Sequence, residues 1–210
     1  MKKLILMLLL LTTVVMAGFR RVQYDKPKSN SGVKLSIALS NHIGEDAETD
    51  GSYNEAKFGY GIGIFSIIPI SNIFSIQPEL LFTQKGYIEV NDRVFYSDKR
   101  VTQNYIQIPV LLAIKTVASL KLYGGGYIGY LTNIWVRSSN MSPSERRDEE
   151  RKLEKNTKSF DAGFAVGLIL KGNRNMLFDF RYERGLTTLD IDNKDYYYNH
   201  SFKLSFDWLF

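Results

Sequence analysis

The chain has 210 residues, enough for one domain of ordinary size, and it contains no cysteine, which excludes disulfides and thiolate metal sites. Lysine and arginine number 27 against 22 acidic residues, for a formal charge of +5. Residues 1–17 contain two lysines and no acid, so 25 − 22 = +3 remains without them, too little to indicate nucleic-acid binding.

The N-terminal segment has the pattern of a secretory signal peptide. Lys2 and Lys3 are followed by an apolar run over residues 4–19, which contains a Val-Met-Ala cleavage pattern. A membrane anchor is the competing interpretation, but this run of 16 residues is shorter than the roughly 20 that a spanning helix needs. We predict a signal peptide over 1–17 and a polar periplasmic tail over 18–31.

The remaining residues, 32–210, divide into segments in which apolar and polar side chains alternate. Because successive side chains of a strand point to opposite faces, this period of two predicts β-strands with one apolar and one polar side. The eight predicted strands cover 33–39, 58–67, 74–83, 105–115, 120–136, 160–170, 176–183 and 200–210. The last is the clearest, since its apolar face carries Phe202, Leu204, Phe206, Trp208 and Phe210.

The connections between these segments alternate in length. Short turns are expected at 69–72, 117–119 and 172–175, and long polar loops at 44–54, 89–102, 137–159 and 189–199. Bacterial outer-membrane barrels have short periplasmic turns and long external loops. No apolar run after the signal peptide is long enough for a membrane helix, and the other structure that satisfies the backbone in lipid is a closed barrel. We predict one closed antiparallel up-and-down barrel of eight strands, located in the outer membrane, with both termini in the periplasm.

The polar face of the predicted strands carries full charges. The candidates for the barrel lumen are Glu79, Lys121, Asp161, Asp179, Arg181, Glu183 and Lys203. One interpretation is a path for ions, and the other is a structural network of ion pairs. An eight-stranded barrel has room inside only for side chains, which favours the structural network.

A soluble lipocalin-like barrel also has eight alternating strands, but its apolar face lines the interior. Aromatic residues favour the membrane alternative, because they lie where the two interface girdles of a transmembrane barrel belong. Those expected toward the loop rim are Tyr60, Tyr130, Trp135 and Tyr182, and those toward the periplasmic rim are Trp208 and Phe210.

Five stretches, in order, resemble the PorT-like outer-membrane β-barrel proteins of Bacteroidetes-type bacteria, a resemblance that covers about residues 33–210. They are FSIQPELLFTQKGY (74–87), YIQIPVLLAIK (105–115), YGGGYIGYL (123–131), DAGFAVGL (161–168) and FDFRYERGLTTL (178–189). The resemblance implies a small outer-membrane barrel, often labelled porin-like. It brings no catalytic residues and does not settle the molecular role.

Pro78 and Pro109 fall in the middle of predicted strands. A closed barrel has no edge strand that could tolerate the missing N–H donor, so we predict a β-bulge or a local kink at each proline.

Patterns that could carry chemistry are few. Neither the glycines around residues 59–63 nor those at 124–126 precede a helix, so they do not predict a phosphate-binding loop. Lipid-modifying enzymes use a serine with a histidine, but His200 and Ser201 are adjacent on a strand and point to opposite faces, and His42 has no evident serine partner.

Two loops remain. The acidic loop with Asp190, Asp192 and Asp195 lacks the glycine and the bidentate acid of a calcium-binding loop, so we expect no bound metal. The loop 137–159 carries seven basic and five acidic residues and could form a short exposed helix. It is interpreted either as a contact for lipopolysaccharide phosphates or a partner protein, or as a solvated loop.

These observations predict a non-enzymatic outer-membrane barrel, without a cofactor, that has a structural, anchoring or secretion- or transport-accessory role. Its expected partners are outer-membrane lipid and an envelope protein that contacts the loops or the tail. A narrow porin-like channel and a soluble lipocalin-like ligand-binding barrel remain as alternatives.

Overall fold

The computed structural model describes residues 30–44, 52–91, 98–172, 175–191 and 196–210. The predicted signal peptide 1–17 and most of the predicted tail 18–31 lie outside these residues, so both stay predictions. The first described strand begins at Asn30, which assigns the last two residues of the predicted tail to the barrel.

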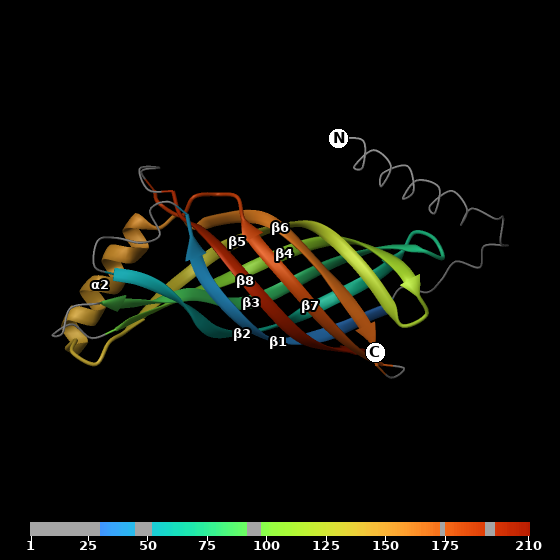
Figure 1. The fold of residues 1–210 in the computed structure, drawn as a ribbon, viewed down its shortest axis with the longest axis horizontal. Coiled ribbons are helices and arrows are strands. Elements are labelled where there is room, and N and C mark those ends of the chain that lie inside the picture. Colours follow the sequence, from blue (N-terminus) through green and yellow to red (C-terminus); the bar gives the residue numbers. More distant parts are fainter. Residues whose placement is uncertain (1–29, 45–51, 92–97, 173–174, 192–195) are drawn as a thin grey trace.

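The described residues form one closed barrel of eight strands in sequence order, with the last strand paired to the first (Figure 1). Every neighbouring pair is antiparallel, which confirms the predicted up-and-down topology. The strands are β1 (Asn30–Ile43), β2 (Ser52–Pro69), β3 (Phe74–Asn91), β4 (Lys99–Val117), β5 (Leu120–Arg137), β6 (Phe160–Lys171), β7 (Met176–Gly185) and β8 (Tyr198–Leu209). Among the described residues, no helix is both long and apolar enough to cross a membrane.

The period-two alternation of the sequence becomes an outer apolar face and an inner polar one. On β8, Phe202 is 58% exposed and Trp208 44% exposed, whereas Lys203 and Asp207 between them are buried. The same alternation runs through β1 and β4. A soluble barrel with an apolar interior would show the opposite pattern, so this barrel presents its apolar face to lipid.

The two ends of the barrel differ. Short turns join β2 to β3, β4 to β5 and β6 to β7 at the end where the C-terminus lies, and we call this the periplasmic mouth. The strand ends that the longer connections join, and a helix, α2 (Pro143–Asn156), lie at the opposite end (Figure 1). Several strands run further than predicted at this loop end, since β3 reaches Asn91 and β4 begins at Lys99.

The prediction of a β-bulge or a local kink at each mid-strand proline is wrong in its first part, because no bulge forms at either proline. The β2–β3 ladder is interrupted at Pro78 and the β3–β4 ladder at Pro109, but the register is the same on both sides of each gap. Each proline removes a hydrogen bond because it has no N–H. A one-residue shift would turn every following side chain to the other face of the wall, which explains why the register is kept.

The interior is packed in layers along the barrel axis. At the periplasmic mouth an apolar cluster closes the lumen, and we call it the plug; it consists of Phe65, Ile67, Leu111, Ala113, Tyr123, Ala165, Ile169, Leu177 and Leu209. Charged residues follow toward the loops, for example Asp179 and Arg181 above Leu177 on β7. A second apolar cluster at the loop end consists of Val101, Tyr105, Leu131, Ile134 and Val136.

Helix α2 forms where the charged loop predicted one, and it covers an unpaired strand edge. The ladder between β5 and β6 ends at Tyr130, so the last residues of β5 have no strand partner on that side. The amides of Ile134 and Val136 instead donate to the carboxylates of Glu154 and Glu150 on α2, at 3.1 and 2.9 Å. The helix therefore satisfies backbone donors that would otherwise form an open edge.

Candidate functional site in the barrel lumen

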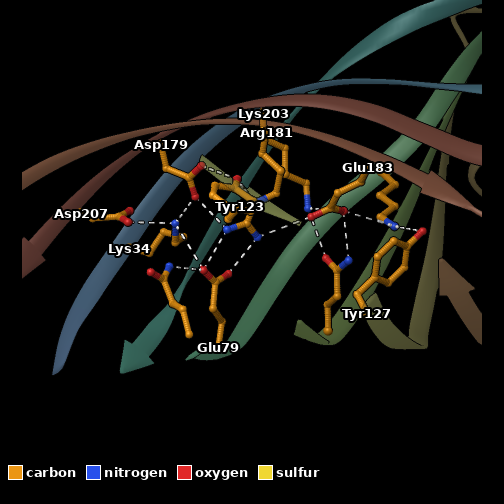
Figure 2. A network of polar contacts seen from close by, with 12 residues as sticks. Lys34, Glu79, Tyr123, Tyr127, Asp179, Arg181, Glu183, Lys203 and Asp207 are labelled. Atoms are coloured by element: carbon orange, nitrogen blue, oxygen red, sulfur yellow. Dashed lines mark hydrogen bonds and ion pairs between the residues drawn. The ribbon is translucent and has the colours of Figure 1, made fainter. Parts of the chain in front are cut away.

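Six of the seven predicted lumen charges lie in one buried network in the middle of the barrel, and Figure 2 labels all of them except Asp161. They are Glu79, Asp161, Asp179, Arg181, Glu183 and Lys203, and none is more than 5% exposed. Lys121 also has the inward orientation of its strand, but it lies at the periplasmic mouth and is partly exposed. Lys121 therefore lies on the predicted face of its strand but outside the network of ion pairs.

Arg181 is the centre of one half of the network. Its two terminal nitrogens each donate to one oxygen of Glu79 at 2.8 Å, which is the paired geometry that a planar guanidinium and a carboxylate favour. The same side chain donates to Asp179 at 2.7 Å and to the Tyr123 hydroxyl at 2.9 Å. Lys34 from β1 approaches Asp179 from the other side and lies 2.8 Å from Asp207.

Glu183 is the centre of the other half. It accepts from Lys203 at 2.8 Å and from the Gln107 amide at 2.9 Å. Lys85 lies 3.0 Å from Asp161 and 3.8 Å from Glu183, and its ammonium is 4.4 Å from the centre of the Tyr127 ring. Arg181 also reaches Glu183 at 3.6 Å, which joins the two halves into one network with members on seven strands, all except β2.

The sequence reasoning missed three charges of the network, Lys34, Lys85 and Asp207, and two tyrosines, Tyr123 and Tyr127. The signal for Lys34 was present, because its neighbours on either side are apolar and must face lipid. Asp207 was on the polar face of the clearest strand but was not included. Lys85 lies after the third predicted strand, 74–83, so the alternation did not assign it to a face.

Two glycines make room for the tyrosines. Tyr123 and Tyr127 on β5 lie directly opposite Gly167 and Gly163 on β6. A Cβ atom added at Gly163 would lie 2.8 Å from the Tyr127 ring, and one at Gly167 would lie 2.6 Å from the Tyr123 ring carbon that carries the hydroxyl. Only glycine leaves space for these rings to reach the charged layer.

The charges of the network nearly balance. Four cations, Lys34, Lys85, Arg181 and Lys203, face five carboxylates, Glu79, Asp161, Asp179, Glu183 and Asp207. Every one of these groups has an opposite charge within 4.0 Å, as buried charges require. The arrangement can hold seven of the eight strands together, and it offers no exposed acid, base or nucleophile to a substrate.

The six predicted interface aromatics all lie on the outer face of the barrel. Tyr60, Tyr130, Trp135, Trp208 and Phe210 are between 44% and 78% exposed. Tyr182 is half-buried by the neighbouring rings of Phe164 and Phe202. Their depth in the membrane stays a prediction.

The histidines do not form a nucleophile–base pair. His42 is buried inside the barrel against Gln103 and the Tyr87 ring, whereas His200 faces outward beside Tyr182, and Ser201 is buried. In the parts of the chain that the structure describes, no group of three acidic or histidine side chains could hold a metal ion. Asp192 and Asp195 of the predicted acidic loop lie outside those parts.

Comparisons with known proteins agree with this architecture. Residues 23–190 match the family described as "Outer membrane protein beta-barrel domain". No curated protein matches the sequence.

Two solved structures share the fold. Ail, the attachment invasion locus protein of Yersinia pestis, solved with the heparin analogue sucrose octasulfate, has 14% identity and a TM-score of 0.50. Neisserial surface protein A has 13% identity and a TM-score of 0.52. Each match covers 88% of this chain and 100% of the other. The chain belongs to the outer-membrane β-barrel family that matches four fifths of its length, and it is a protein of the outer membrane.

Proposed function

We propose that this protein is a non-enzymatic outer-membrane barrel that acts through its two ends, as an anchor or as an accessory of secretion or transport. The lumen serves to hold the barrel together, and partners bind at the loop end or at the periplasmic mouth.

The closed lumen is the observation that carries this proposal. Along the axis, the plug is followed by the network around Arg181 and Glu183, and then by the second apolar cluster. Large side chains fill these layers, and Tyr105 and Lys85 among them are at most 1% exposed. An ion that crossed the barrel would have to break several buried ion pairs at once, each of which costs about 3–5 kcal/mol when one partner is lost.

The loop end supports a role in contacts outside the cell. Helix α2 carries five basic and five acidic residues among its 14, and none of its residues is buried. It is nevertheless held in place, because Glu149 pairs with Lys99 at 3.1 Å while Glu150 and Glu154 bind the edge of β5. A fixed helix with an unburied charged face is a surface that a partner can recognise.

A narrow porin-like channel is the alternative, and conductance distinguishes the two. The folded protein, verified by its heat-shifted band on gels, is reconstituted into planar bilayers beside a sixteen-stranded porin as a positive control. We expect no stepwise current, because the lumen is filled. Reproducible unitary currents that scale with the amount of inserted protein would overturn the proposal.

A further inference from the structure

Three lysines gather at the periplasmic mouth. Lys115, Lys121 and Lys171 come from the adjacent strands β4, β5 and β6. Lys115 lies directly opposite Lys121 in the ladder, and all three continue the inward-facing series of their strands. Their ammonium groups therefore surround the opening of the lumen, whereas lysines that anchor a barrel in lipid headgroups lie on its outer face.

Among the described residues, these lysines have no acidic partner. The described residues place no carboxylate within 4.0 Å of any of the three, and the walls of the pocket that they line contain no acidic residue. The carboxylates of the lumen lie deeper, where they pair with four other cations. The three positive charges repel one another, so an anion that enters the mouth relieves that repulsion.

The pocket between the lysines has an apolar floor. Its volume is about 450 Å³, a size that fits a small ligand or a few side chains. The floor is the underside of the plug, with Ile67, Ile169, Leu177 and Leu209, and Ser71 and Ser75 also line the pocket. A ligand that fits this pocket carries acidic groups for the rim and an apolar group for the floor.

We propose that the periplasmic mouth binds an acidic peptide segment of an envelope protein, with its carboxylates on Lys115, Lys121 and Lys171 and one apolar side chain on the plug. A peptide fits better than a bilayer lipid, because the lysines face the mouth and the barrel wall separates the plug from the acyl chains. This inference rests on the proposed function and identifies one of the two ends through which the barrel acts.

The test uses the full-length folded protein in a zwitterionic detergent, with its lysines labelled as ¹³C-dimethyl-lysine, which keeps their charge. The probe is the hexapeptide Glu-Glu-Leu-Glu-Glu-Phe, and the matched control has glutamine in place of each glutamate. The signals of the three mouth lysines, assigned by single Lys→Arg variants, are compared with those of Lys152 and Lys155 on α2, which are exposed.

We expect the acidic peptide to shift the three mouth signals saturably, and the glutamine peptide to leave them unchanged. The triple variant Lys115→Gln, Lys121→Gln, Lys171→Gln should bind the acidic peptide at least tenfold more weakly and still show the heat-shifted band. The proposal is overturned if the mouth signals do not saturate, if the α2 lysines respond equally, or if the triple variant binds as well as the wild type.

A second experiment distinguishes binding of a peptide at the mouth from binding of an anionic lipid. In nanodiscs, phosphatidylglycerol replaces part of the phosphatidylcholine without any peptide present. We expect the mouth signals to stay in place; a shift that the peptide cannot compete away would assign the site to lipid and overturn the proposal. Failure of peptide binding would leave the closed lumen intact, whereas unitary currents in planar bilayers would count against the proposed function alone.

Discussion

The lumen network and helix α2 contain nearly the same number of charges, nine and ten, yet the barrel uses them in opposite ways. In the lumen each charge is buried and lies within 4.0 Å of an opposite charge, and Arg181 is held by several partners. On α2 most charges are exposed, and the pair Asp148–Arg151, at 3.9 Å with both side chains more than 70% exposed, is typical of the weak kind. Burial, more than the number of ion pairs, decides how much a charge contributes to the fold.

The largest effect should come from Arg181→Met. This change leaves Glu79 and Asp179 buried without their main partner, and we expect it to lower the free energy of unfolding by about 3–5 kcal/mol. Unfolding in guanidinium chloride, followed by the fluorescence of Trp135 and Trp208, measures it. Arg184→Met, at an exposed outward position of the same strand, is the control and should change stability by less than about 0.5 kcal/mol.

The next effect concerns the space that Gly167 leaves for the ring of Tyr123 beside the charged layer. Gly167→Ala places a methyl group against the Tyr123 ring and the backbone of β7, and overpacking of this kind costs about 1–3 kcal/mol. The control is Gly124→Ala, whose added methyl meets nothing closer than 3.8 Å. Equal stability of the two variants would show that the ring of Tyr123 is not packed tightly against Gly167.

At the loop end, Glu150→Ala removes the acceptor of the Val136 amide, and this should be a local effect. Loss of that hydrogen bond costs about 1–3 kcal/mol, so hydrogen exchange at Val136 should be roughly tenfold faster or more. Unfolding of the barrel as a whole should be unchanged. Glu150→Gln retains a carbonyl acceptor and should restore slow exchange; if it does not, the acceptor role of Glu150 is wrong.

The smallest effect concerns the start of α2. Ser142→Ala removes the N-cap acceptor of the Glu145 amide, and such losses cost about 1 kcal/mol. The hydrogen bond from the Ser142 amide holds the pKa of Glu145 below its ordinary value, so this contribution is present at neutral pH and is lost as the pH falls through the lowered pKa.

In the wild type, the protection of the α2 amides from hydrogen exchange should therefore fall as the pH falls through the lowered pKa of Glu145. Ser142→Ala keeps the backbone amide that binds Glu145, so it should start from weaker protection and show the same loss with pH. Arg151→Ala, which breaks only the exposed pair with Asp148, is the matched control. If Arg151→Ala speeds hydrogen exchange in α2 as much as Ser142→Ala does, the distinction between weak exposed ion pairs and carboxylates bound to the backbone is wrong.

The sequence predicted the fold well because alternation is a local property. A strand that faces lipid on one side and a narrow polar lumen on the other must alternate at every residue, and eight such segments were visible. The same alternation of inward and outward residues identified six of the charges in the network. It could also have identified Lys34, since Val33 and Leu35 on either side face outward.

Depth along the barrel was not predictable in the same way. Lys121 and Lys203 both face inward, yet one lies at the periplasmic mouth and the other in the charged layer, because depth depends on how the strands are staggered. The sequence also did not predict that α2 covers the unpaired edge of β5. The charged run predicted a helix, but only the structure shows that β6 stops pairing at Phe160 and leaves an edge for Glu150 and Glu154.

The measurement that tests the structural role of the lumen charges most directly is a double-mutant cycle between Arg181 and Glu79. The variants are Arg181→Met, Glu79→Leu and the two combined, and the quantity is the coupling in the free energy of unfolding. A buried bidentate pair predicts a coupling of at least about 2 kcal/mol, with the double variant more stable than the sum of the singles implies. A coupling below about 0.5 kcal/mol would contradict it, and the lumen charges would then need another explanation than the stability of the barrel.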